Sequence, residues 1–152
     1  RNKQDFGLQL IDYYADFFYS RLDYYLDLKQ ETFLNRLRLF FAEFIQELEN
    51  NKCQGGCPLG NLSQEMADID EDFREKLNQI FLQIRGKIEY FLQESSKNKE
   101  LSPEYDPGEL AHFILNSWQG ALLQMKVSKT VEPLKNFDRL IFETILNSRR
   151  QK

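Results

Sequence analysis

The sequence predicts an all-α fold in which six helices form one domain. Apolar residues recur every three or four positions over several long stretches, which is the spacing of one helix face. The 152 residues include only 7 Gly and 4 Pro, and we find no convincing strand-like alternation. Hydrophobic residues make up 41% and charged residues 29%, so residues 1–152 are expected to fold around a single core.

Charge and cysteine content exclude several classes of protein. The formal net charge is −4, and the only basic cluster is at the end of the chain, so this polypeptide alone is a poor nucleic-acid binder. No apolar run reaches membrane-spanning length, so we expect no membrane partner. Two cysteines in such a chain fit a cytoplasmic protein better than a disulfide scaffold.

The first two predicted helices span residues 4–27 and 30–51. The stripe of the first helix includes Phe6, Leu10 and Tyr14, and that of the second includes Phe33, Leu37 and Phe40. The polar side of the second helix is expected to carry Arg36, Arg38, Glu43, Gln46 and Glu47.

A third, short helix follows an unusual segment. Gly55 and Gly56 permit backbone angles that other residues avoid, so they are expected to form a hinge. Pro58 suits the first helical position, which places Cys57 at the N-cap. This helix is expected to end near Asp68, and its apolar face carries Leu59, Leu62 and Met66.

The last three helices are predicted at 71–97, 107–128 and 131–149. Asp70 and Asp106 are expected to cap the first two, and a polar loop with two prolines separates them. The helix at 107–128 is apolar most of the way round, with only Asn116, Gln119 and Gln124 breaking its surface, so we expect it to be buried on more than one side.

The sequence allows two interpretations of Cys57. The positive end of a helix dipole favours the thiolate, which would form sulfenic acid and then condense with a nearby nitrogen or with Cys53. Alternatively, Cys57 is a small, half-buried capping residue. A standing disulfide between the two cysteines is disfavoured in the cytosol, and with the distant His112 they leave a zinc site one ligand short.

Enzyme activity is not expected. The chain has one histidine and no Gly-x-Ser-x-Gly, P-loop or dinucleotide motif, so general acid–base catalysis and cofactor binding have few groups to use. His112 itself is expected to face solvent or to be satisfied within the core. We therefore predict no catalytic residues, no cofactor and no metal.

The aromatic residues, 13 Phe, 7 Tyr and 1 Trp, need a large interior, a cavity or a partner surface. Plain core packing and a ligand cavity both fit their spacing. For a cavity, the expected lining residues are Tyr14, Phe17, Phe18, Phe41, Phe44, Leu62, Met66, Phe81, Trp118 and Gln119.

Several segments resemble TetR-type transcriptional repressors. Asn-Lys-Gln-Asp-Phe-Gly (2–7) is similar to the segment after the recognition helix of that family, and Gly-Cys-Pro-Leu-Gly-Asn-Leu (56–62) to its Gly-Cys-x-x-Gly-Asn-Leu segment. Trp-Gln-Gly-Ala-Leu-Leu-Gln-Met-Lys (118–126), followed by Glu-Pro-Leu (132–134), resembles its last two helices. The resemblance covers the whole chain and depends on the order and spacing of these motifs.

This resemblance implies the C-terminal ligand-binding and dimerisation domain of such a repressor. The partners it implies are a small apolar or aromatic effector and a second copy of the chain. The last two helices of each copy would form a four-helix interface. The expected interface residues are Leu115, Leu122, Phe137, Leu140, Ile141 and Ile145.

Within the family, the chain is most similar to NemR-type regulators, which sense electrophiles and oxidants through a cysteine. Cys57 falls at the position of the sensing thiol, and Lys126 at that of a lysine able to pair with the oxidised sulfur. Residues 1–5 would be the remnant after a missing helix-turn-helix, through which operator DNA would bind. The alternatives are a stand-alone helical module that binds a small molecule without a DNA partner, and a redox sensor without a ligand pocket.

Overall fold

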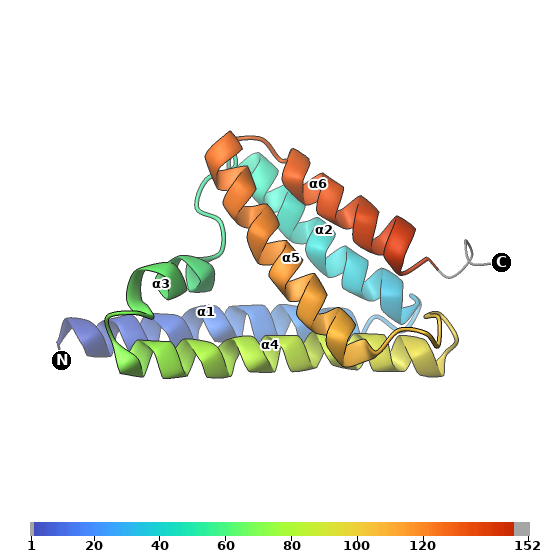
Figure 1. The fold of residues 1–152 in the computed structure, drawn as a ribbon, viewed down its shortest axis with the longest axis horizontal. Helices are drawn as coiled ribbons and strands as arrows, with labels where there is room; N and C mark the ends of the chain where they lie inside the picture. The colour runs from blue at the N-terminus through green and yellow to red at the C-terminus, as the bar shows by residue number, and fades with distance from the viewer. Residues whose placement is uncertain (1, 148–152) are drawn as a thin grey trace.

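The computed structural model describes residues 2–147, and every regular element in this range is helical (Figure 1). The all-α prediction is therefore confirmed. The elements are α1 (Lys3–Leu26), α2 (Phe33–Asn50), α3 (Pro58–Met66), α4 (Glu71–Lys97), α5 (Pro107–Ser128) and α6 (Glu132–Asp138), which continues as the π-helical turn η1 (Arg139–Ile145).

Helices α1 and α4 lie side by side and run in the same direction along the long axis of the molecule (Figure 1). Three polar contacts join them: Lys76 Nζ donates to Asp12 Oδ2 at 2.6 Å, Tyr19 donates to Gln83 at 2.5 Å, and Lys87 donates to Asp23. All three pairs are 64 residues apart, which is the constant offset of a parallel register.

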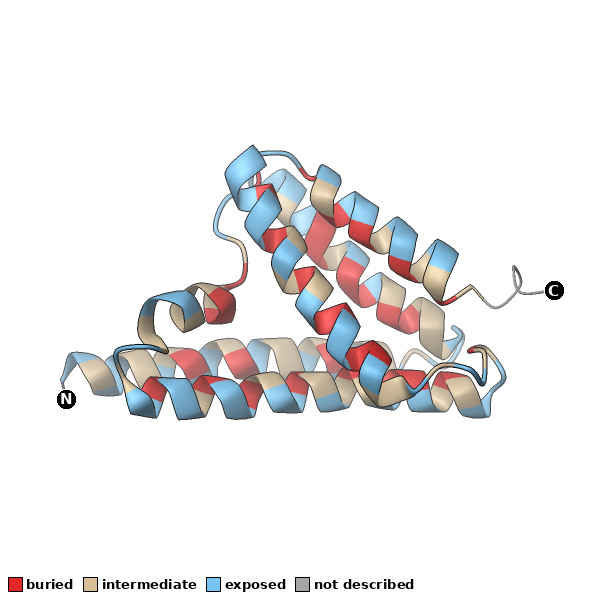
Figure 2. Ribbon diagram, viewed as in Figure 1, coloured by how far each residue is buried: buried red, intermediate tan, exposed pale blue. Residues whose placement is uncertain are grey.

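Helices α2, α5 and α6 pack together and cross this pair at an angle, and α3 lies in the angle between α5 and the N-terminal half of α1 (Figure 1). Phe41 is at the centre of the contact: its ring centroid lies 4.9 Å from that of Trp118 and 5.0 Å from that of Phe137. The buried residues face inward between the two groups of helices (Figure 2), so the core is continuous across the domain.

Side-chain caps explain where the helices begin and end. Asp70 and Asp106 cap α4 and α5 as predicted, by accepting from backbone N–H groups three residues later. Helix α2 begins at Phe33 rather than residue 30, because the Thr32 hydroxyl accepts from the N–H of Asn35 at 3.2 Å. Helix α3 ends at Met66 rather than near residue 68, since the chain turns there into the extended cap of α4.

The last helix departs from the prediction in its second half. After Asp138 the backbone widens into a π-helical turn, in which Leu146 N–H bonds to the carbonyl of Ile141 at 2.8 Å. Arg38 of α2 gives a physical reason, because it binds both Asp138 at 2.6 Å and Glu143 at 2.7 Å. Residues five apart share a side only in this wider helix. The predicted end at 148–149 lies outside the described residues.

Candidate ligand-binding site

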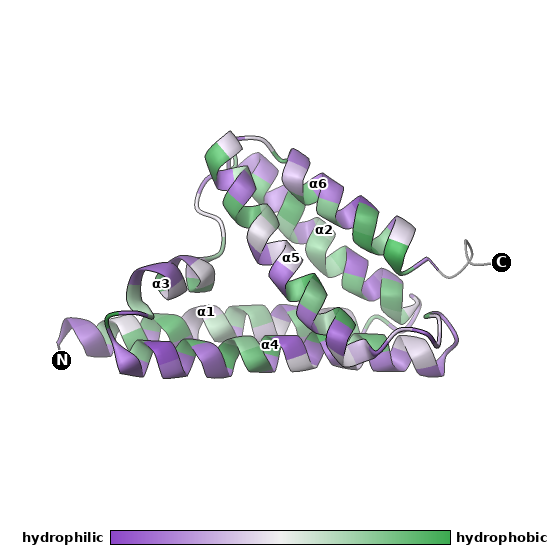
Figure 3. Ribbon diagram, in the orientation of Figure 1, coloured by the Kyte–Doolittle hydropathy of each residue, from purple (hydrophilic) through white to green (hydrophobic). Residues whose placement is uncertain are grey.

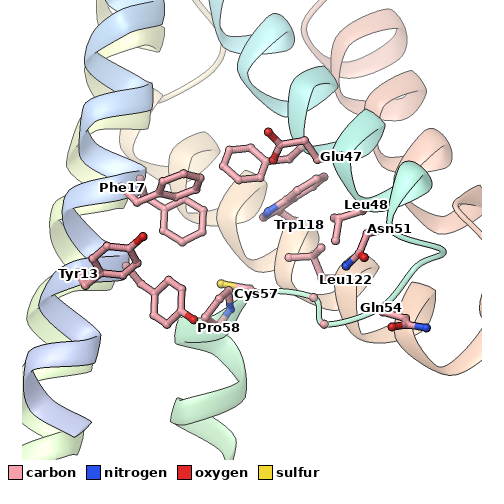
Figure 4. A pocket seen from close by; sticks show the side chains of 15 residues that line it. Tyr13, Phe17, Glu47, Leu48, Asn51, Gln54, Cys57, Pro58, Trp118 and Leu122 are labelled. Atoms are coloured by element: carbon pink, nitrogen blue, oxygen red, sulfur yellow. The ribbon is translucent and has the colours of Figure 1, made fainter. Parts of the chain in front are cut away.

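A cavity of about 360 Å³ lies between α1, α2, α5 and the segment before α3 (Figure 4). Its walls come from four parts of the chain that are distant in sequence. The lining residues are Tyr13, Tyr14, Phe17, Phe18, Phe44, Glu47, Leu48, Asn51, Gln54, Gly55, Gly56, Cys57, Pro58, Trp118 and Leu122.

Six of the fifteen lining residues are aromatic. Phe18 of α1 stacks on Phe44 of α2 with ring centroids 5.3 Å apart, and Phe17 meets Phe44 edge-on at 6.2 Å. Trp118 and Leu122, one turn apart on α5, close the opposite side (Figure 4). Such a surface suits an apolar or aromatic molecule, which gains from contact with ring faces and from leaving water.

The charged group on the wall is the Glu47 carboxylate, which a guanidinium holds from outside the cavity. Arg21 Nη2 donates to Glu47 Oε1 at 2.8 Å, and Nη1 lies 3.4 Å from Glu43. The Arg21 guanidinium also lies over the rings of Phe17 and Phe44, 4.4 and 5.0 Å from their centroids. This arrangement fixes the two rings and the carboxylate relative to one another.

The segment before α3 reaches the cavity through a series of left-handed residues. Lys52, Cys53, Gly55 and Gly56 all have φ between 54° and 84°. Lys52 and Cys53, at 54° and 56°, lie in the narrow left-handed region that other residues can adopt, whereas Gly55 and Gly56, at 84° and 77°, lie beyond it, where a side chain is strained. This path brings Cys57 to the N-cap of α3, as predicted, and turns its sulfur towards the cavity (Figure 4).

Of the two interpretations of Cys57, its burial favours the neutral capping thiol over the thiolate. Burial raises the pKa of Cys57, and this effect outweighs the hydrogen bonds from the Gly60 N–H, the Gln119 side chain and the Leu59 N–H, which favour the charged form. The sulfur accepts from the Gly60 N–H at 3.4 Å. Cys57 is therefore a protonated thiol at neutral pH, because the desolvation cost exceeds the effect of the helix terminus.

The other two residues of the redox prediction have different surroundings. Cys53 is buried, carries a free thiol like Cys57, and is not among the lining residues. Lys126 Nζ donates to Asn61 Oδ1 at 3.2 Å, and Asn61 Nδ2 donates to the carbonyl of Gly55 at 2.8 Å. Lys126 thus binds α3 through Asn61.

The structure divides the predicted pocket residues into three groups. Tyr14, Phe17, Phe18, Phe44 and Trp118 line the cavity. Phe41 is 1% exposed within the core, and Leu62 and Met66 pack against the core from α3. Phe81 and Gln119 line a separate groove between α4 and α5, together with Asn116 and the exposed His112.

Sequence reasoning missed several lining residues, of which Tyr13 and Glu47 are the most informative. Both are classed as exposed, and Glu47 was assigned to the polar side of its helix. The sequence did contain a signal for the lining residues of α1: two adjacent aromatic pairs four residues apart, Tyr13-Tyr14 and Phe17-Phe18. They widen the aromatic face of α1 beyond what the core alone requires.

The predicted dimer residues are mostly internal. Leu115, Leu122, Phe137 and Ile141 are each at most 7% exposed within the protomer, so they support its own core, and Leu122 lines the cavity. Leu140 is 41% exposed and Ile145 is half-buried. A groove between α5 and α6 is lined by four of the predicted residues, Phe137, Leu140, Ile141 and Ile145, and also by Phe113, Ser117, Gly120 and Gln124.

Two further findings concern the described residues as a whole. No helix between residues 2 and 147 has both the length and the apolarity needed to cross a membrane. In the same range, no group of three or more His, Cys, Asp or Glu side chains is placed to hold a metal ion.

Sequence comparison relates the chain to known regulators. Residues 34–141 match the family described as "Tetracyclin repressor-like, C-terminal domain". The chain is 36% identical over 140 residues to the transcriptional regulator AcuR of Cereibacter sphaeroides, covering 91% of this chain and 64% of AcuR. It is 29% identical over 147 residues to the HTH-type transcriptional repressor DhaR of Mycobacterium sp. strain GP1, covering 97% of this chain and 72% of DhaR.

Solved structures show the same fold. The regulatory protein TetR from Rhodobacter sphaeroides superposes with a TM-score of 0.89 at 34% identity, covering 94% of this chain and 76% of that chain. The reduced form of NemR from E. coli superposes with a TM-score of 0.80 at 25% identity, covering 95% and 75%. The chain therefore belongs to the TetR family of transcriptional regulators, which are not enzymes, and corresponds to the C-terminal domain of that family.

Proposed function

We propose that this chain is the effector-binding and dimer-forming domain of a TetR-family repressor that acts in the bacterial cytoplasm. The observation that supports this proposal most directly is the aromatic cavity of about 360 Å³, which is large enough for a small apolar or aromatic molecule. Four of its lining residues belong to α1, the helix that would lead to a preceding DNA-reading domain. Operator DNA would bind through that domain and not through this one.

The position of α1 suggests how an effector would act. Tyr13, Tyr14, Phe17 and Phe18 form the α1 wall of the cavity, so a molecule that spreads this wall displaces α1 relative to α2 and α5. The start of α1 is tied to α4 by Gln4, whose amide donates to Asp70 at 3.1 Å and to Asp72 at 3.0 Å. A small shift of the helix would change the spacing of two DNA-reading domains in a dimer and release the operator.

A pair of neighbouring substitutions tests the cavity. Leu122→Phe adds volume to the wall, whereas Leu123→Phe adds the same volume at a residue that is 45% exposed. We expect Leu122→Phe to weaken the binding of small aromatic alcohols at least about tenfold and Leu123→Phe to leave it unchanged. The fluorescence of Trp118, the single tryptophan of the chain, reports binding directly. Equal affinities in the two variants, or no binding to the unsubstituted chain, contradict the proposal.

A second copy would dock on the groove between α5 and α6. Ser117 and Gly120 are small, and a side chain added at Gly120 meets nothing within 4 Å inside the protomer. Together with the exposed Phe113 and Leu140, they offer an apolar surface that a neighbouring helix can approach closely. The interface proposed on this basis uses the predicted helices. Of the predicted residues, Phe137, Leu140, Ile141 and Ile145 line this groove, whereas Leu115 and Leu122 do not.

A second candidate function is covalent capture of an electrophile by Cys57. It is favoured by the position of the sulfur on the cavity wall, where a bound molecule would contact it (Figure 4). With N-ethylmaleimide, the sulfur forms a bond to one alkene carbon as the C=C π bond breaks; the thiol gives its proton to solvent, and solvent protonates the other carbon. Mass spectrometry comparing the chain with Cys57→Ser tests this function. If Cys57 reacts no faster than a free thiol, the cavity does not promote capture, and sensing through Cys57, with Lys126 or Cys53 as partner of the oxidised sulfur, is wrong.

A further inference from the structure

The cavity wall is uneven in charge. Among its 15 lining residues, one carboxylate, Glu47, is present, and there is no Lys, Arg or His. Burial keeps Cys57 neutral by raising its pKa, and the remaining lining side chains are uncharged at neutral pH. A ligand inside therefore meets one negative charge and no positive one on the wall itself.

The nearby guanidinium does not reverse this charge. Arg21 is not among the lining residues, and it is bound to both Glu47 and Glu43. Two carboxylates thus face one guanidinium, so the cluster as a whole is negative. Of the two Glu47 oxygens, Oε1 accepts from Arg21, and no hydrogen bond to Oε2 is formed by the described residues. The Glu47 side chain is 46% exposed, so its negative charge lies at the solvent-facing edge of the cavity, where it repels an anion.

The helix terminus at the wall does not offer an anion site either. Pro58 has no N–H, and the Gly60 N–H is bound to the Cys57 sulfur at 3.4 Å. The next N–H, of Asn61, is bound to the Cys57 carbonyl at 2.9 Å. Cys57 therefore occupies the place where an anion would meet the positive end of the α3 dipole. The faces of the surrounding aromatic rings carry partial negative charge, so they also make the binding of an anion less favourable.

We propose that the cavity selects against anions, so that its effector is an uncharged or positively charged molecule with an apolar or aromatic body, and that Glu47 is the residue that sets this selectivity. The inference rests on the proposed function, because it assumes that the effector binds in this cavity. An effector whose recognition depends on a carboxylate or phosphate is excluded by it.

Three probes of similar size isolate the charge: benzylamine as its cation, benzyl alcohol and benzoate. They are titrated into the chain at one ionic strength near 0.15 M, with Trp118 fluorescence and calorimetry as readouts. We expect benzoate to bind at least about tenfold more weakly than benzyl alcohol, and the benzylammonium ion to bind as tightly as the alcohol or tighter.

Glu47→Gln keeps the size of the side chain and leaves Arg21 paired with Glu43 alone. We expect this substitution to lower the ratio of the dissociation constants of benzoate and benzyl alcohol at least about threefold. The affinity for benzyl alcohol should stay within about twofold of its original value. Glu49→Gln is the matched control: it lies two residues further on α2, pairs with Lys135 at 3.1 Å and does not line the cavity. It should leave all three affinities unchanged.

The possible failures are distinguishable. If benzoate binds as tightly as benzyl alcohol, or if Glu47→Gln leaves the ratio between them unchanged, the charge selectivity is wrong while ligand binding in the cavity stands. If none of the three probes binds, the proposed cavity function fails, and the selectivity falls with it. If Glu49→Gln changes the affinity for benzoate as much as Glu47→Gln does, Glu47 is not the residue that sets the charge selectivity.

Discussion

Apolar residues occur on two sides of α5, and the two sides have different surroundings. One side presents Trp118 and Leu122, which are at most 6% exposed and line the cavity. The other presents Phe113 and Gly120, which are exposed in the groove against α6. Hydropathy alone does not distinguish the sides, because apolar residues colour the helix on several faces (Figure 3), whereas burial does (Figure 2).

This difference shows how one helix can serve two purposes. The buried side packs in the core and lines the cavity, where large residues such as Trp118 are held by ring contacts. The other side is the one on which we propose that a second copy docks, and small residues such as Ser117 and Gly120 would allow a neighbouring helix to approach closely. Substitutions on the two sides should therefore change different measurements.

The largest effect is expected on the buried side. Trp118→Ala removes a ring that contacts Phe41 at 4.9 Å and Phe137 at 5.2 Å, and it enlarges the cavity beside it. We expect the free energy of unfolding to fall by about 3–5 kcal/mol in urea denaturation followed by circular dichroism. A loss below about 1 kcal/mol would mean that Trp118 is not part of the core contact. Phe113→Ala is the control, with a small effect on the unfolding of the protomer.

The next effect separates dimerisation from folding. Gly120→Leu places a side chain in open space within the protomer, and Leu has the higher helix propensity. We expect the dimer dissociation constant to rise about a hundredfold, while the helical content stays the same. Analytical ultracentrifugation over a concentration series gives the constant. If the dimer is unaffected, the second copy docks elsewhere.

A smaller effect is expected where Gln119 of α5 meets the start of α3. The Gln119 side chain donates to the Cys57 sulfur and favours the thiolate, although burial keeps the pKa of Cys57 above its ordinary value. In a Cys53→Ser background, alkylation of Cys57 should increase about tenfold per pH unit below that pKa, and should be half-maximal at a higher pH than for a free thiol.

Gln119→Ala should move this half-maximal pH further upward, because a hydrogen bond that favours the charged form is lost. The pH of half-maximal rate separates this effect from a change in access to the sulfur, which alters the rate at every pH. A half-maximal pH below that of a free thiol would show that the helix terminus outweighs burial after all.

The smallest effect is expected on the third side of α5. Asn116 is one of the three polar residues that break the apolar surface of this helix, and it is exposed in the groove shared with α4. Asn116→Ala should change stability by less than about 0.5 kcal/mol and leave the affinity of benzyl alcohol and the dimer constant unchanged. A weaker ligand affinity in this variant would relocate the binding site to the groove between α4 and α5.

Local chemistry determined most of what was predictable about the fold. The bounds of α4 and α5 followed from the caps Asp70 and Asp106 and from the apolar period, because both act over a few neighbouring residues. The position of Cys57 followed in the same way from Pro58 and the two glycines. Five of the ten predicted pocket residues line the cavity, since the aromatic face of α1 was visible in the sequence.

Only the tertiary structure decided the remaining features. Arg36 was assigned to a polar helix side, yet it is 8% exposed because its guanidinium binds the carbonyls of Leu26 and Glu31 across the turn between α1 and α2. The state of the Cys57 thiol depends on burial by elements far away in the chain. The division of α5 into a side that lines the cavity and a side that lines the groove against α6 depends on where α2, α4 and α6 pack against it. The sequence by itself determined the helices and their caps, since these obey local rules, and packing alone determined which apolar side chains enclose a cavity.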